Sequence, residues 1–249
     1  MRPTFGRVSR HGAMVLSWSQ DRLGPMVRYA EDAAIVMQAI ARPDGRDLHV
    51  TDIPFNWNAR LDVSRLRVGY IRHSFDAVTH PVAKQNLERS LAVLRQIGVT
   101  DLIEVEVPEM ETGVSAMNAE AGAFFDAYAR SGRMKTARGS FGHQSNRLLP
   151  AVDYIQAQRV RMMGMMQLEA ATRHVDVYIV ASNSSGEPAA APGGGGARGN
   201  DLPQDPTRRH STIANLGGYP AMNVPNGFGP TGSPTNFVVF AQPFREAQV

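Results

Sequence analysis

The chain has 249 residues, of which 43% are hydrophobic, and this is enough for one sizeable core. It contains no cysteine, which excludes disulfides, thiolate metal ligands and cysteine nucleophiles and fits a reducing compartment. The formal net charge is only +3 and the arginines are scattered along the chain, so we expect no nucleic-acid partner.

The clearest predicted helix begins near Pro25, because proline suits the first helical position. Apolar residues then recur at helical spacing from Met26 to Ile40, and Pro43 with Gly45 ends the run.

Residues 65–107 predict a strand–helix–strand unit, the pattern of an α/β protein. A short apolar strand is expected in Arg65–His73, and an amphipathic helix follows, with Gly98 placed to cap its end. The stripe of this helix is Ala83, Leu87, Leu91 and Leu94. The second strand alternates apolar residues with Glu104 and Glu106, which read as solvated carboxylates.

The second half of the chain predicts two further helices, near 114–130 and 152–174, and the second is rich in methionine. It runs directly into "VDVYIVAS", which reads as a buried strand. The glycine- and proline-rich stretch 186–206 is expected to be a flexible loop. A strand end and turn are expected at Val224–Phe228, and a last strand at Phe237–Phe240.

The sequence contains no assembled reactive centre that the residues alone identify. No two of its seven histidines lie three to five residues apart, so we expect neither a metal site nor a cofactor. "GSFG" (139–142) and "SNSSG" (182–186) are the serine-containing candidates for a nucleophile, but neither has the G-x-S-x-G form of a nucleophile elbow. Both read better as loops.

Four stretches in order resemble the amidase signature family, which includes bacterial amidases and the A subunit of glutamyl-tRNA amidotransferase. "RPTFGRVSRHG" is similar to its K/R-P-T-x-G-R-V-S segment, and "SQDRLGPMVRYAEDAAIVMQAI" to its S-x-D-x-x-G-P-M-x-R helix. "VDVYIVAS" takes the place of a buried family strand. "NLGGYPAMNVPNGF", followed by "GSPTNFVVFAQPFREA", resembles the family's ending.

This resemblance implies an α/β fold with a mixed, largely parallel sheet flanked by helices. Residues 1–249 would form a single partial domain, the C-terminal portion of an amidase domain, incomplete at its N-terminal end and also trimmed at its C-terminal end. Family members hydrolyse carboxamide C–N bonds with a Ser–Ser–Lys set, one serine of which lies on a strained cis peptide. That set would fall before Met1, so we expect no catalytic residue in this chain and no turnover by it alone.

The resemblance also bears on substrate recognition. Arg161, at the end of a Y-x-x-A-x-x-x-R pattern, is the candidate substrate-binding residue, with a surface or packing role as the alternative. Arg208 stands near the place where the amidotransferase relatives carry an acidic residue for the amide donor. This difference argues against glutamine-dependent tRNA amidation.

Three functions remain open at this stage. The first is an amidase fragment that contributes to a pocket for a small amide. The second is a non-catalytic protein on the same scaffold that binds a ligand or partner, and the third and weaker one is an amidotransferase A-like protein. We expect a cytoplasmic location and no membrane partner, because no apolar run is long enough to cross a bilayer and no secretory leader is visible. The resemblance leaves a homodimer open.

Overall fold

The structure is a computed structural model that describes residues 1–107, 114–133, 147–182 and 206–249. Its centre is a five-stranded sheet in the order β2-β1-β3-β5-β4. The strands are β1 (Val68–Tyr70), β2 (Leu102–Glu104), β3 (Val177–Ala181), β4 (Ala221–Phe228) and β5 (Pro234–Ala241). Only β5 runs against the others, because β1 is parallel to β2 and β3 while β5 is antiparallel to β3 and β4. The predicted α/β class with a mixed, largely parallel sheet is confirmed.

The strand–helix–strand unit is present as β1, α3 (Pro81–Gln96) and β2. Ala83 and Leu87 of the predicted stripe are buried, and Gly98 has a φ of 95° at the end of the helix. A residue with a side chain rarely adopts this left-handed conformation, which explains why the turn uses glycine. β1 is shorter than predicted, because η1 (Val63–Arg65) precedes it and α2 (Arg72–Asp76) follows it closely. β2 is also shorter than predicted, since it ends at Glu104.

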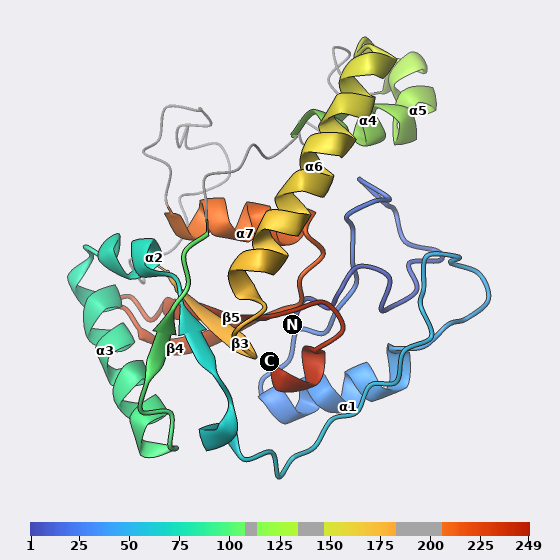
Figure 1. Cartoon of the computed structure of the whole chain (residues 1–249). Helices are drawn as coiled ribbons and strands as arrows, with labels where there is room; N and C mark the ends of the chain where they lie inside the picture. Colours follow the sequence, from blue (N-terminus) through green and yellow to red (C-terminus); the bar gives the residue numbers. More distant parts are fainter. Residues whose placement is uncertain (108–113, 134–146, 183–205) are drawn as a thin grey trace.

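Helices cover both faces of the sheet, and β3 divides the core between them (Figure 1). Tyr178 and Val180 point to the face covered by α6 (Ala151–Thr172) and α7 (Pro206–Leu216). Val177 and Ile179 point to the opposite face, where Leu94 of α3 packs. All five residues of β3 are buried, as expected for a central strand covered on both sides.

The first helix begins later than predicted. α1 is Ala30–Ile40, and Pro25 lies in non-helical chain before it. The Pro25 carbonyl accepts a hydrogen bond of 2.7 Å from the amino group of Met1. Gly24 passes so close to Met1 that a Cβ there would lie 2.4 Å from the Met1 carbonyl oxygen. Tertiary contact with the start of the chain therefore keeps this proline segment extended.

The second half of the chain also differs from its predicted boundaries. The helix expected at 114–130 is broken into α4 (Val114–Phe124) and α5 (Asp126–Arg130). The sequence pattern does not predict α7. The loop expected at 186–206 lies outside the described residues except for Pro206, which begins α7.

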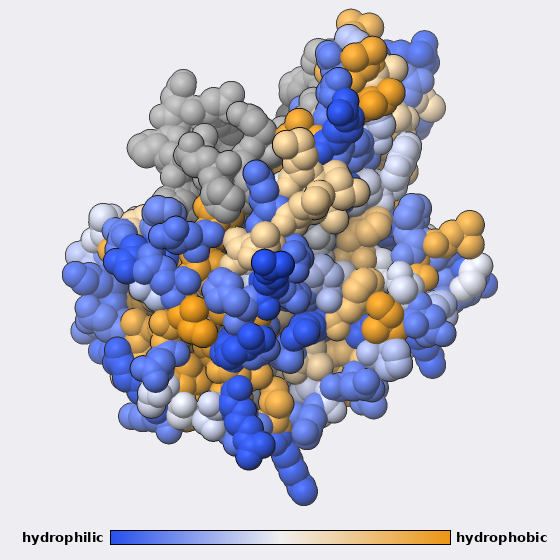
Figure 2. Space-filling model, viewed as in Figure 1, coloured by the Kyte–Doolittle hydropathy of each residue, from blue (hydrophilic) through white to orange (hydrophobic). Residues whose placement is uncertain are grey.

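The methionine-rich helix α6 has two apolar faces. Its buried residues include Ala157 and Leu168, which face the core. Five exposed apolar residues fall within an arc of about 100° on the other side, at 100° per residue. They are Val152, Ile155, Met162, Met163 and Met166. Figure 2 shows apolar atoms along the part of α6 that projects from the molecule. No helix in the described part of the chain is long and apolar enough to cross a membrane.

His210 of α7 is a buried histidine inside the main core cluster. Its ring lies edge-on to Tyr178 and Phe240, with centroids 5.3 Å and 5.2 Å away, and its Nε2 is 3.0 Å from the Tyr178 hydroxyl oxygen. Burial lowers the pKa of His210 to about 3, since the charged imidazolium loses its hydration there. This histidine therefore stays neutral in the folded protein at neutral pH.

His210 should make the protein less stable as the pH falls from 7.5 to 5.5. Below about pH 6.5 the unfolded histidine binds a proton and the folded one does not, so protons favour unfolding. The loss from this group is on the order of 1 kcal/mol over that interval. Urea unfolding at several pH values measures it. We expect His210→Gln to remove this part of the pH dependence. The control variant His73→Gln, which changes an exposed histidine, should retain it. Identical pH profiles for wild type and His210→Gln would contradict the assignment.

Candidate functional site

A buried ion pair joins the beginning of the chain to its end. Arg7 is fully buried, and its Nε lies 3.4 Å from Oε2 of Glu246, which begins the 3-10 turn η4 (Glu246–Gln248). The guanidinium also donates to the carbonyls of Ile53 at 2.5 Å and Pro54 at 3.1 Å. The charged side chain is therefore compensated by one carboxylate and by backbone carbonyls.

Thr4 strengthens the same junction from the other direction. Its backbone N–H donates to Oε1 of Glu246 at 2.8 Å, and its hydroxyl accepts from the backbone N–H of Phe244 at 2.7 Å. Phe244 has a φ of 65°. Together with Arg7, these contacts bring the "RPTFGR" and "PFRE" stretches into one buried cluster.

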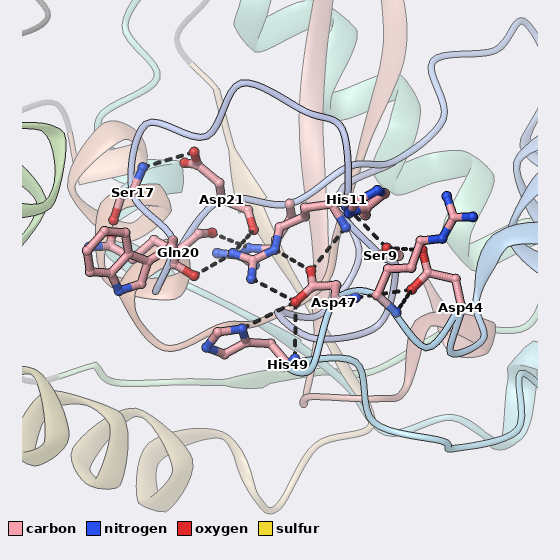
Figure 3. A network of polar contacts seen from close by, with 12 residues as sticks. Ser9, His11, Ser17, Gln20, Asp21, Asp44, Asp47 and His49 are labelled. Atoms are coloured by element: carbon pink, nitrogen blue, oxygen red, sulfur yellow. Dashed lines mark hydrogen bonds and ion pairs between the residues drawn. The ribbon is translucent and has the colours of Figure 1, made fainter. Parts of the chain in front are cut away.

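Asp47 organises a second polar network next to this cluster (Figure 3). Arg10 donates to Asp47 Oδ2 through Nε at 2.9 Å and through its backbone N–H at 3.0 Å. The hydrogen bond from Arg10 holds the pKa of Asp47 well below its usual range. His49 approaches from the loop side, with Nδ1 3.2 Å from Asp47 Oδ1. A hydrogen bond from Ser9 similarly lowers the pKa of the exposed Asp44 to about 2.

Glu120 is the centre of a third cluster, between the N-terminal segment and the helices α4 and α6. It is buried, and it accepts hydrogen bonds from the hydroxyls of Ser17 and Ser19, the latter at 3.0 Å. Tyr154 and Gln158 of α6 donate to its other oxygen at 3.2 Å and 3.3 Å. Two serine hydroxyls thus meet at one point, but their shared acceptor is a carboxylate.

Arg161 lies beside the Glu120 cluster and bridges two segments of backbone. Its Nε donates to the Leu216 carbonyl and its Nη2 to the Ser19 carbonyl, each at 2.9 Å. Burial lowers its pKa, and the charge of Glu120 acts in the opposite direction. These contacts tie α6 to the end of α7 and to the N-terminal segment.

Arg22 contributes a second guanidinium to this region. It donates to the Tyr219 carbonyl at 2.8 Å and to the carbonyl and side-chain oxygens of Asn215 at 2.5 Å and 2.6 Å. Burial lowers its pKa to about 9, and the nearby charges of Arg2 and Arg161 act in the same direction. The three arginines make this part of the interior positive, with Glu120 facing Arg161.

Of the residues singled out from the sequence, the structure describes only some, and it places these in separate elements. Arg161 is half-buried on α6, Lys84 is exposed on α3, and Lys135 lies outside the described residues. The "GSFG" stretch also lies outside them, and of "SNSSG" only Ser182 is described. Within the described ranges, no group of three or more His, Asp or Glu residues is placed to hold a metal ion.

Neither buried carboxylate, Glu120 or Glu246, is predicted from the sequence. Glu246 belongs to a family-like motif, but its neighbours Arg245 and Ala247 give no local signal that this carboxylate is buried. Glu120 lies in an alanine-rich helix, "AMNAEAGAF", where a lone charge among small residues is the one available signal. Such a signal is weak, because the partners lie about a hundred residues away along the chain.

The comparisons with known proteins concern the whole chain. The amidase family profile matches residues 1–249. The A subunit of glutamyl-tRNA(Gln) amidotransferase from Akkermansia muciniphila is 31% identical across 99% of this chain and 59% of its own length. An amidase from Pseudomonas putida is 30% identical across 93% of this chain and 52% of its own length.

The solved structures agree on the fold. The A subunit of the corresponding amidotransferase from Thermotoga maritima gives a TM-score of 0.70 at 22% identity, covering 99% of this chain and 54% of that one. The chain therefore spans between about half and three fifths of the length of these three proteins.

Glu246→Ala should destabilise the fold strongly. Removing this carboxylate leaves the buried Arg7 charge uncompensated and the Thr4 N–H without its acceptor, which typically costs about 3–5 kcal/mol. Urea denaturation of the variant and wild type measures the difference.

The control is Arg130→Ala, which breaks the exposed pair between Arg130 and Asp126 and should cost about 0.3–0.5 kcal/mol. If Glu246→Ala does not fold, the double variant Arg7→Met/Glu246→Leu should recover part of the loss, because it removes both charges. Equal effects of Glu246→Ala and Arg130→Ala would show that the buried pair is not important for stability.

Proposed function

The chain belongs to the amidase family, and from this premise we propose that its 249 residues supply part of an enzyme that hydrolyses a carboxamide C–N bond. The observation that carries the proposal is the family match over the whole chain. The buried Arg7–Glu246 pair supports it, since it joins two of the four family-like stretches into one framework. In this proposal the chain is one partial amidase domain.

We further propose that the chain alone does not catalyse hydrolysis. The resemblance calls for two serines and a lysine base, and the sequence has only two lysines, Lys84 and Lys135. Lys84 is exposed on α3, while the hydroxyls of Ser17 and Ser19 donate to Glu120. A neutral amine is the base in that mechanism, and the guanidinium of Arg161 cannot replace it because arginine stays protonated.

Arg161 is retained as the proposed substrate-binding residue. Its guanidinium is half-buried, and burial lowers its pKa, so binding to a polarised substrate carbonyl would stabilise its charge. Its two hydrogen bonds to the Leu216 and Ser19 carbonyls support the alternative, in which it positions α6 against its neighbours.

An amidotransferase A-like protein is the second candidate function. It is favoured by the 31% identity to the A subunit from Akkermansia muciniphila, whereas Arg208 stands near the place expected for an acidic contact to the amide donor. A gel shift with tRNA at physiological salt discriminates the two, since tight tRNA association favours this candidate. A non-catalytic binding protein on the same scaffold is the third reading.

The cellular location and the oligomeric state of the protein are parts of the same proposal. The absence of cysteine fits a cytoplasmic location. For the assembled enzyme we propose a small amide substrate and a homodimer, which light scattering after size-exclusion chromatography tests.

The purified 249-residue chain should release no ammonia from benzamide above the rate of an enzyme-free blank. Loss of an entire nucleophile–base set lowers kcat by about a million-fold in well-studied hydrolases. An amidase that has first been shown to release ammonia from benzamide, assayed alongside, checks that the conditions support turnover. Ammonia release that rises in proportion to the concentration of this chain would overturn the proposed inactivity.

A further inference from the structure

The methionine-rich run of α6 lies largely at the surface of the protein rather than in its core. Four of the 12 methionines of the chain fall within five consecutive residues, "MMGMM", from Met162 to Met166. Met162 is 57% exposed, Met163 is 61% exposed and Met166 is 65% exposed. Packing in the core therefore does not account for these three side chains.

Helix geometry places the three exposed thioethers on one face of α6. Met166 is four residues after Met162 and three after Met163, and residues at these spacings are neighbours on a helix surface, with Cβ atoms about 5–6 Å apart. At 100° per residue the three positions span about 100°. Methionine is unbranched and has three rotatable bonds, so sulfur atoms on neighbouring positions can converge on one point.

Three thioethers at this spacing suit a soft metal ion. Thioether sulfur is a soft ligand that selects Cu(I), whereas carboxylate and carbonyl oxygens suit harder ions. The chain has no cysteine, so methionine supplies its only sulfur ligands. The described ranges contain no group of three or more His, Asp or Glu residues placed to hold a metal ion, and that result concerns other donor atoms. The thioether face of α6 is thus a separate candidate.

The charged neighbours on α6 allow a cation to approach this face. Arg159 donates from its guanidinium to the side chain of Gln156 at 3.2 Å, toward the preceding turn of the helix. Arg161 donates to two backbone carbonyls outside α6. The exposed Glu169 is three residues after Met166, so its carboxylate lies on the same side of the helix. Both arginines therefore have other partners, and the carboxylate adds a favourable charge.

We propose that Met162, Met163 and Met166 form a binding site for Cu(I) on the surface of α6. The three sulfur atoms donate lone pairs to an ion that arrives already reduced, so no bond in the protein breaks and no electron is transferred. Thioethers carry no proton, and the affinity of this site is therefore independent of pH. The site does not depend on the proposed hydrolysis of amides.

Competition with bicinchoninate measures the binding. The purified 249-residue chain is added, without oxygen and with ascorbate, to the coloured complex of Cu(I) with bicinchoninate, whose absorbance falls when the protein takes the ion. Met162→Leu/Met166→Leu removes two thioethers and keeps apolar side chains of similar size. Met14→Leu/Met26→Leu is its matched control, because it also removes two thioethers of exposed side chains, but from outside α6.

We expect the wild type and the Met14→Leu/Met26→Leu control to bind Cu(I) with affinities that agree within twofold. Met162→Leu/Met166→Leu should bind at least tenfold more weakly. The affinity of the wild type should be equal at pH 7.5 and pH 5.5, whereas a site made of histidines would lose affinity as they bind protons. No binding by the wild type, equal weakening in the two double variants, or a loss of affinity at pH 5.5 would overturn the site.

A second measurement on the wild type needs no substitution in the site. Ag(I) is a soft ion of the same charge that requires no reductant, and it is added to protein labelled with carbon-13 at the methionine methyl groups. The methyl signals of Met162, Met163 and Met166 should shift together, while those of Met14 and Met26 stay in place. Single Met→Leu variants assign the signals. Parallel shifts at all five methionines would show a general affinity for thioethers and overturn the site.

Discussion

The fold depends on the buried charge of Arg7, which a carboxylate near the other end of the chain compensates. If Arg7 left its buried position, the Ile53 and Pro54 carbonyls would lose its hydrogen bonds. If it stayed there without a compensating charge, the cost in solvation free energy would be large. Glu246, near the other end of the sequence, supplies the compensating charge and also accepts from the Thr4 N–H. The last strand and the first segment are thus fixed against each other, and the sheet is completed between them.

The same requirement, that buried polar groups be satisfied, positions the helices on one side of the sheet. Glu120 brings Ser17 and Ser19 against α4 and α6, and Arg161 connects α6 to the end of α7. Arg22 extends the connection to Asn215 and Tyr219, and its guanidinium also reaches the more distant Pro3 carbonyl. Most of these contacts join a side chain to backbone far away in sequence, so they specify tertiary arrangement rather than local structure.

The periodicity of apolar residues and the placement of glycine are enough to predict some of the helices, turns and strands. The stripe of α3, the turn at Gly98 and the buried strand β3 follow from periodicity and from glycine chemistry, and the structure confirms all three. The start of α1 and the existence of α7 depend on tertiary contacts: Pro25 is held by Met1, and α7 is a polar helix anchored by buried residues such as His210 and Ile213. No rule of spacing could have paired Arg7 with Glu246. The resemblance to a family identified the two stretches, but their contact explains why both belong to one framework.

In the described part of the chain, the polar and the apolar side chains of the N-terminal family-like stretches lie in different surroundings. Several polar residues of the family-like stretches bond to other residues of the protein: Arg7 to Glu246, Arg10 to Asp47, and Ser19 to Glu120. Several apolar side chains between Met14 and Val36, among them Met26, Tyr29 and Ile35, are exposed to solvent instead. These polar contacts join segments that are distant in the sequence, so they hold the framework together while those apolar side chains remain at its surface.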